Sequence, residues 1–192
     1  MLTIQTLPLG YLQTNCYILQ GSDGCLVIDP GDQADAVLHC LGDRKLGAIL
    51  LTHAHYDHVG AVKDLAAETD CQVFLHAGDL TLPQAMTAGT LYHTHTYEDG
   101  QVLNLCGLEI TVLHTPGHTP GSVCLCCEDS MFAGDTLFAG SIGRTDFPGS
   151  SPAQMAKSMT KLKALDKNYT VYPGHGESTT LDEEKRYNPF LR

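Results

Sequence analysis

Short apolar runs along the chain are separated by polar segments and by stretches with helical spacing. Ten runs of four to six residues predict β-strands. They cover residues 2–6, 15–20, 24–29, 47–52, 71–75, 102–105, 108–113, 122–127, 130–134 and 169–172. Three stretches repeat their apolar residues three or four positions apart and predict helices over 34–41, 62–66 and 155–165. Strands and helices therefore alternate along most of the chain.

The last predicted helix has a clear start. Ser151 is an expected N-cap, and Pro152 follows at the first helical position, where its missing N–H does no harm. No short repeat or low-complexity stretch interrupts the chain, so its 192 residues are expected to form one domain over positions 1–192.

The densest group of metal-binding residue types follows the predicted strand over 47–52. Residues 50–59 read LTHAHYDHVG. Within six positions they place four such side chains: His53, His55, Asp57 and His58. Three imidazoles and a carboxylate at one strand end would repel when protonated and would lack hydrogen-bond partners when neutral. The spacing therefore favours a metal site over a structural role.

Three later segments also place a His or Asp just after a predicted strand. HTPGHTPGS (114–122) contributes His118, MFAGDTLFAG (131–140) contributes Asp135, and VYPGHGES (171–178) contributes His175. Loops at strand ends are where α/β sheets gather ligands. Together with the first motif, these segments supply five histidines and two aspartates, enough for two metal sites that share one carboxylate and one hydroxide.

At these motifs the chain resembles the metallo-β-lactamase superfamily, whose H-x-H-x-D-H signature matches residues 53–58. TPGHTPGS, GDTLF, GRTDF and PGHG look like the glyoxalase II-like branch of that superfamily and stand in the same order. The resemblance implies an α+β fold, a four-layer αββα sandwich with metals at one edge between the two sheets.

The resemblance also implies two divalent metal ions. It assigns His53, His55 and His118 to one ion, Asp57, His58 and His175 to the other, and Asp135 to both. Zinc is the first expectation, and iron and manganese are alternatives because His/Asp sites accept all three. Asp29 matches the family's early aspartate and is expected to support the site without binding a metal.

The expected activity is hydrolysis of a thioester, an acyl-thiol similar to hydroxyacylglutathione. Two ions acting on one water lower its pKa from about 15.7 to near neutrality, which makes a bridging hydroxide available at pH 7. A thiolate leaves readily because its pKa is near 8.5. Asp57 is the expected catalytic residue that carries the proton.

A different reaction class remains open. Persulfide dioxygenases, which are oxidoreductases, resemble this chain in H-x-H-x-D-H and GRTDF but use a single iron held by two His and one Asp. The complete set of seven dinuclear ligands favours hydrolysis instead. Lactone or β-lactam hydrolysis ranks third, and a non-enzymatic metal-binding module ranks fourth because structural zinc sites close with four ligands.

The resemblance to glyoxalase II supports the metal chemistry better than it supports the substrate contacts. Glyoxalase II carries a C-terminal helical domain that contacts glutathione, whereas only residues 179–192 follow the last ligand loop here, and Glu177 stands where a glutathione-contacting Tyr is expected. Arg144 and Phe147 stand where basic and aromatic contacts are expected. Arg144 could bind a substrate carboxylate or pair with Asp146. We expect poor selectivity among thiols.

The remaining histidines and one tyrosine have weaker assignments. His93 and His95 either face solvent, the favoured interpretation, or line the pocket. His76 and His114 are expected to hold loops by hydrogen bonds, and Tyr56 to fill space only.

The composition of the chain limits the classes of binding partner. Eleven Lys and Arg against 22 Asp and Glu give a formal charge of −11 with no basic cluster, which argues against nucleic acid. Without a long apolar run or a leader-like N-terminus, we expect no membrane association and a cytoplasmic location. The eight cysteines read as buried thiols of a reducing compartment, because neighbouring residues of a strand such as 122–127 point to opposite faces and form a poor metal site. A small thioester is then the expected partner, and the oligomeric state stays open.

Overall fold

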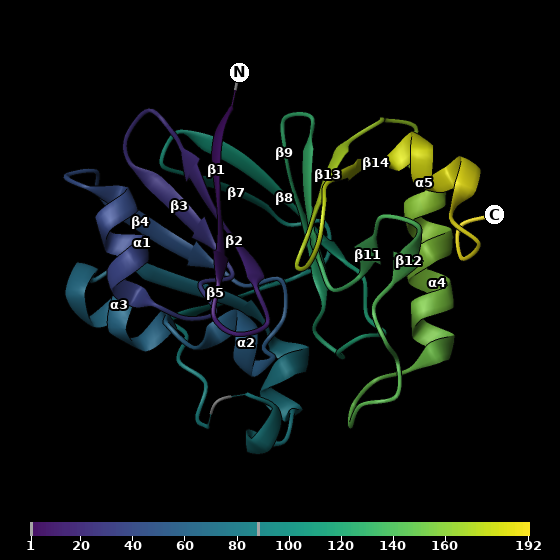
Figure 1. Cartoon of the computed structure of the whole chain (residues 1–192), viewed down its shortest axis with the longest axis horizontal. Coiled ribbons are helices and arrows are strands. Elements are labelled where there is room, and N and C mark those ends of the chain that lie inside the picture. Colours follow the sequence, from purple (N-terminus) through teal and green to yellow (C-terminus); the bar gives the residue numbers. More distant parts are fainter. Residues whose placement is uncertain (1, 88) are drawn as a thin grey trace.

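The computed structural model describes residues 2–87 and 89–192. Two six-stranded sheets face each other, and helices cover the outer face of each sheet (Figure 1). This arrangement confirms the expected four-layer αββα sandwich of the α+β class. The layers follow from the hydrophobic pattern, because strands buried on both faces need a second sheet on one side and helices on the other.

The first sheet comes from the N-terminal half of the chain and has the order β1-β2-β3-β4-β5-β6. Its strands are Thr3–Leu9 (β1), Thr14–Gln20 (β2), Cys25–Ile28 (β3), Leu46–Leu50 (β4), Gln72–His76 (β5) and His95–Tyr97 (β6). The strands from β1 to β3 pair antiparallel, and those from β3 to β6 pair parallel. Helices Ala34–Leu41 (α1) and Val62–Thr69 (α3) cover its outer face.

The second sheet has the order β14-β13-β10-β9-β8-β7. Its strands are Val102–Leu105 (β7), Leu108–His114 (β8), Val123–Cys127 (β9), Ser130–Gly134 (β10), Thr170–Pro173 (β13) and Thr179–Thr180 (β14). Only the β10 and β13 pair is parallel among the paired strands described. Helices Pro152–Lys163 (α4) and Leu181–Tyr187 (α5) cover this sheet.

Smaller elements lie at the edge where the site forms. They are the one-turn helix Tyr56–Val59 (α2), the 3₁₀ turns Ala77–Thr81 (η1) and Gln84–Met86 (η2), and the hairpin of Leu137–Phe138 (β11) with Ser141–Ile142 (β12). They lie in the connections that follow β4, β5 and β10 of the two large sheets.

Alternate residues of the buried strands divide between the inner and outer cores. In β3, Leu26 packs between the sheets, whereas Val27 packs under the helices. In β9, Cys124 and Cys126 pack toward α4, whereas Cys127 faces the other sheet. The run of cysteines therefore splits between two faces, as its strand pattern predicted, and does not form a thiolate site.

The sequence located all ten long strands to within a few residues. The predicted start of α4 is also confirmed, since Ser151 Oγ accepts a hydrogen bond from the Gln154 backbone N–H at 3.3 Å. The pattern did not predict β6, β11, β12, β14 or α5. Each is short, and α5 buries only Leu181 and Glu184, so its periodicity is weak.

Two buried polar side chains of α5 fix the β11–β12 hairpin. Glu184, which is 4% exposed, accepts hydrogen bonds from the Gly140 backbone N–H at 2.8 Å and from Asn188 Nδ2 at 2.8 Å. Asn188 Nδ2 also donates to the Ser141 carbonyl at 3.0 Å. The C-terminal helix therefore holds the hairpin that carries Phe138.

No helix in the described ranges, residues 2–87 and 89–192, is long and apolar enough to cross a membrane.

Candidate metal centre

All seven side chains named from the motifs converge at one edge of the sandwich. The loop after β4 and helix α2 supply His53, His55, Asp57 and His58, while the loops after β8, β10 and β13 supply His118, Asp135 and His175. The carboxyl ends of parallel strands lie at the same edge of a sheet, so residues far apart in sequence meet there.

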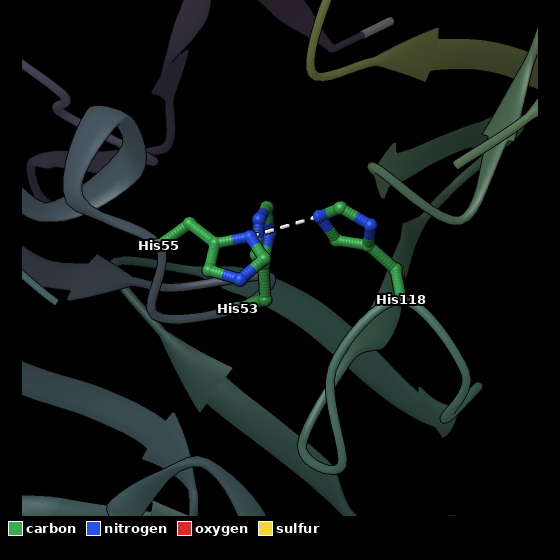
Figure 2. Close-up of side chains that lie close together, drawn as sticks. All are labelled: His53, His55 and His118. Atoms are coloured by element: carbon green, nitrogen blue, oxygen red, sulfur yellow. Dashed lines mark hydrogen bonds between the residues drawn. The ribbon is translucent and has the colours of Figure 1, made fainter. Parts of the chain in front are cut away.

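Three imidazoles form the first group. His53, His55 and His118 each place a ring nitrogen within 4.8 Å of the others. Their rings turn toward one another from two separate loops (Figure 2). His55 Nδ1 and His118 Nε2 are 2.9 Å apart, and the centroid of the His53 ring is 4.9 Å from each of the other two ring centroids.

Asp57, His58 and His175 form the second group, also with donor atoms within 4.8 Å of one another. Asp57 Oδ2 lies 3.2 Å from His175 Nε2 and 3.6 Å from His58 Nε2. All three side chains are at least partly buried. This group lies next to the first, since the ring centroids of His53 and His58 are 4.0 Å apart.

Asp135 lies between the two groups. Its Oδ1 is 3.5 Å from His58 Nε2 of the second group. Its Oδ2 is 3.5 Å from His118 Nε2 of the first group and 3.7 Å from His175 Nε2. One carboxylate therefore faces both groups, the placement that a bridging ligand needs.

The donor atoms of this cluster fit metal ions better than they fit one another. Four buried atoms in the described residues have no hydrogen-bond partner: Nε2 of His53, His55 and His58, and Oδ1 of Asp135. Buried polar atoms are otherwise almost always paired. The gaps of 3.5 to 3.7 Å between Asp135 and the ring nitrogens of His58, His118 and His175 are longer than ordinary hydrogen bonds but suit ligands that each lie about 2.0–2.2 Å from a shared ion. Imidazole and carboxylate donors suit zinc, iron and manganese alike.

Surrounding groups fix which nitrogen of each ring faces the cluster. His58 Nδ1 donates to Asp29 Oδ2 at 2.9 Å, and His118 Nδ1 donates to the Arg144 carbonyl at 2.8 Å. Asp29 also accepts hydrogen bonds from the backbone N–H and the hydroxyl of Thr52. Asp29 lies close enough to His53 and His58 to form a third possible group, but its oxygens already have these partners. It therefore has the supporting geometry expected from the sequence.

At His53, His55 and Asp57, the electrostatics favour the protonation states that metal binding requires. Burial lowers the pKa of His55 to about 4, and burial together with the neighbouring imidazoles lowers the pKa of His53 well below its usual range. Burial alone would raise the pKa of Asp57, but hydrogen bonds from His175 and Thr14 and the charge of His58 lower it. Neutral imidazoles and an ionised carboxylate are the forms that bind metals.

His58 and His175 differ from His53 and His55, because neighbouring carboxylates raise the pKa of both imidazoles against the effect of burial. Burial lowers the pKa of His58, but the carboxylates of Asp29 and Asp135 outweigh burial and raise the pKa well above its usual range. The two carboxylates therefore favour positive charge at this position, which a bound cation would also supply.

Asp79 is a functional residue that the sequence did not indicate. Its fully buried carboxylate accepts hydrogen bonds from the Ala54 N–H at 2.8 Å, the Gly121 N–H at 2.6 Å and Thr119 Oγ1 at 3.0 Å. Ala54 stands between two histidines of the first group, and Thr119 follows His118. One carboxylate therefore ties together both loops that form this group. In the sequence a single aspartate at a helix start carries no such signal.

A cavity of about 420 Å³ opens above the cluster. Its described lining residues are Leu12, His55, Tyr56, Asp57, Met86, His118, Asp135, Phe138, Arg144, Phe147 and His175. Tyr56, which was expected only to fill space, is 50% exposed and lines this cavity. The Tyr56 ring lies at the exposed start of α2, whereas the side chains of its neighbours His55 and Asp57 point toward the cluster.

Arg144 is already paired within the chain. Its Nε and one terminal nitrogen bind the two carboxylate oxygens of Asp146 at 2.7 and 2.8 Å, and its guanidinium lies 3.9 Å from the centroid of the Phe147 ring. Of the two roles open from the sequence, the geometry shows the pair with Asp146. The bidentate fork that would bind a substrate carboxylate is occupied.

The other histidines lie outside the cavity. His76 and His114 stack with centroids 4.0 Å apart, and His114 Nε2 donates to the Pro120 carbonyl at 2.9 Å, which fits the structural roles expected of them. His95 is exposed and stacks on Phe74 at 4.7 Å. His93 is half-buried, and neither His93 nor His95 is among the described residues that line the cavity.

Replacing the shared carboxylate tests the ligand arrangement. We expect Asp135→Ala to lower the metal content per chain and to reduce kcat by orders of magnitude, because Asp135 faces both groups. The control is His114→Ala, which removes a partly buried histidine outside the cluster. This variant should retain the metal. Metal content by elemental analysis and turnover of the same preparations check this. Two metals and near-normal turnover in both variants would show the assignment to be wrong.

Asp79→Asn replaces one acceptor oxygen by an amide NH₂ group. This donor would lie against the N–H groups that now donate to Asp79, so one hydrogen bond would be lost. We expect metal affinity to fall about 10- to 100-fold, the usual effect of losing a residue that orients ligands. Competition with a chelator measures this affinity, and Asp64→Asn on the exposed face of α3 is the matched control. Lower thermal stability with unchanged metal affinity would limit Asp79 to a structural role.

Comparison with known proteins agrees with this geometry. Residues 9–175 match the family model described as the metallo-beta-lactamase superfamily. A relative from Haemophilus influenzae, named hydroxyacylglutathione hydrolase GloC, is 33% identical over 99% of this chain and 98% of its own length.

Three solved structures share the fold over nearly the whole chain. The B3 metallo-beta-lactamase BLEG-1 is 35% identical, with a TM-score of 0.87 and coverage of 98% of this chain and 99% of its own. TTHA1623 in a di-iron-bound form is 39% identical, with a TM-score of 0.87 and coverage of 97% and 100%. ETHE1 from Myxococcus xanthus is 29% identical, with a TM-score of 0.85 and coverage of 97% and 83%. The chain therefore belongs to the metallo-β-lactamase superfamily, as a metal-dependent hydrolase with glyoxalase II-like relatives.

Proposed function

We propose that this protein hydrolyses thioesters, acyl-thiols of the hydroxyacylglutathione kind, at a pair of divalent metal ions. The placement of Asp135 between two groups of three ligands carries the proposal, because a single-metal enzyme would leave the second group without a role. The name of the Haemophilus influenzae relative, which matches along nearly its full length, supports the choice of thioesters.

His53, His55 and His118 would hold one ion, Asp57, His58 and His175 the other, and Asp135 would contact both. Bound there, the two ions would lower the pKa of a shared water and polarise the thioester carbonyl. Zinc remains the first expectation, and the di-iron form of TTHA1623 keeps iron as a direct alternative.

Asp57 is the residue proposed to handle the proton. Thr14 Oγ1 donates to Asp57 Oδ2 at 2.9 Å, which orients the carboxylate at the cavity floor. Asp57 lines the cavity beside the proposed ions, within reach of a proton on the water or on the substrate, which is why the proton transfer is assigned to it. The leaving thiolate needs little help, since a thiol pKa near 8.5 makes it a good leaving group at pH 7.

Persulfide oxidation is the second candidate, because the ETHE1 structure shares the fold at 29% identity. Its chemistry would use a single iron held by two His and one Asp. In this chain two complete groups are in place, which favours the hydrolase.

Metal analysis and activity together test the proposal. Protein purified without chelators is assayed for metals, for hydrolysis of thioesters, a lactone and a β-lactam, and for oxygen uptake with glutathione persulfide. We expect two metals per chain and thioester hydrolysis as the fastest reaction. One iron per chain with oxygen uptake and no thioester hydrolysis would overturn the proposal in favour of the dioxygenase.

Selectivity among thiols should be poor. Among the described residues that line the cavity, Arg144 is the one permanent cation, and Asp146 already occupies it. We therefore expect kcat/KM for one acyl group on different small thiols to vary by about tenfold or less. Because Arg144 is paired with Asp146, Arg144→Ala should leave KM for carboxylate-bearing thiols nearly unchanged, as should the exposed control Arg186→Ala. A hundredfold preference for glutathione would contradict this prediction.

A further inference from the structure

Two phenyl rings stand on either side of the metal-binding cluster. The centroid of the Phe147 ring is 5.5 Å from that of His55 and 6.3 Å from that of His118, both in the first group. The Phe138 centroid is 6.3 Å from that of His175, in the second group. Both phenylalanines also line the cavity. A carbonyl placed over the cluster therefore has an aromatic ring within reach on each side.

The rest of the cavity wall is also apolar. Leu12, Tyr56 and Met86 line it, and the first two are 44% and 50% exposed. Large apolar side chains that surround one cavity and remain open to solvent are typical of a surface that a ligand covers. The polar lining residues are the proposed metal ligands and Arg144, which is paired with Asp146. Little polar capacity is left for a charged substrate group.

Both rings are held in place before any substrate arrives. Phe138 belongs to the hairpin that Glu184 and Asn188 bind from α5. Phe147 lies under the Arg144 guanidinium, which the pair with Asp146 fixes. A preformed apolar wall costs less ordering on binding than one that must be assembled.

We infer that the acyl group of the substrate carries an apolar substituent of about phenyl size, which packs against Phe138 or Phe147. In a thioester this substituent is attached next to the reacting carbonyl carbon. Whichever way round the thioester lies over the cluster, the substituent meets one ring and the sulfur side meets the other. The inference rests on the proposed thioesterase function and names its substrate class: aromatic or similarly bulky apolar acyl groups, in preference to lactoyl-sized ones.

A matched pair of thioesters tests this preference. S-mandeloylglutathione and S-lactoylglutathione share the thiol and the 2-hydroxyl group and differ only in phenyl against methyl. We expect kcat/KM of the metal-loaded protein to be at least tenfold higher for the mandeloyl compound. Equal values, or a preference for the lactoyl compound, would overturn the inference.

Variants identify the ring responsible. Phe147→Ala or Phe138→Ala should reduce the mandeloyl preference to about threefold or less while the metal content stays at the level of the unaltered protein. Phe190→Ala removes an equally large, 52% exposed ring outside the cavity and should leave the preference unchanged. An unchanged preference in both cavity variants would also overturn the inference.

Binding of the free acids separates this inference from the proposed function. Mandelate and lactate are titrated into the metal-loaded protein by calorimetry, which needs no turnover. If no thioester is hydrolysed but mandelate binds at least tenfold more tightly, and Phe147→Ala or Phe138→Ala removes the difference, the proposed reaction fails and the apolar acyl site stands. Without thioester hydrolysis, equal binding of the two acids would overturn both.

Discussion

The rest of this structure depends on one buried cluster of histidine and aspartate side chains whose polar atoms lack hydrogen-bond partners. Three histidine nitrogens and one Asp135 oxygen are buried without hydrogen-bond partners in the polypeptide, a cost that a bound cation would remove. The carboxylates of Asp29 and Asp135 raise the pKa of His58, so the same place favours positive charge. The fold thus stabilises an arrangement whose favourable partner is not part of the polypeptide.

The two sheets reach this arrangement by hydrogen bonds that cross from one to the other. Asn15 in β2 of the first sheet donates from Nδ2 to the carbonyls of Pro173 and Gly176, on either side of His175. Tyr17 OH also donates to the Pro173 carbonyl at 2.6 Å. Together with Asp79, which joins the loops of the first group, these contacts place ligands from two sheets within a few ångströms. Positioning the metal ligands is therefore a property of the interface between the sheets.

The candidate metal ligands and the apolar wall of the cavity have separate structural origins. The ligands come from loops after the long strands, which the large cores fix. The wall comes from short elements: the tip of the β1–β2 hairpin, α2, and the β11–β12 hairpin bound by α5. Short segments can change their side chains without disturbing the cores, so one metal chemistry can serve different substrates. The similarity of this chain to a lactamase, a di-iron protein and ETHE1 is consistent with that division.

The long strands, the helices α1, α3 and α4 and the seven candidate ligands could be predicted from the sequence, because hydrophobic periodicity and the spacing of His and Asp are local properties. Even the start of α4 at Ser151 follows from local chemistry. Features that depend on residues distant in sequence were decided only by the tertiary structure. One is the role of Asp79, whose hydrogen-bond donors lie 25 to 42 positions away along the chain. Another is the set of short strands, which are supported by the strands they pair with. It also decided that Arg144 binds Asp146 and that two phenyl rings flank the cluster, since the direction of a side chain in a loop is set by the residues that fold against it.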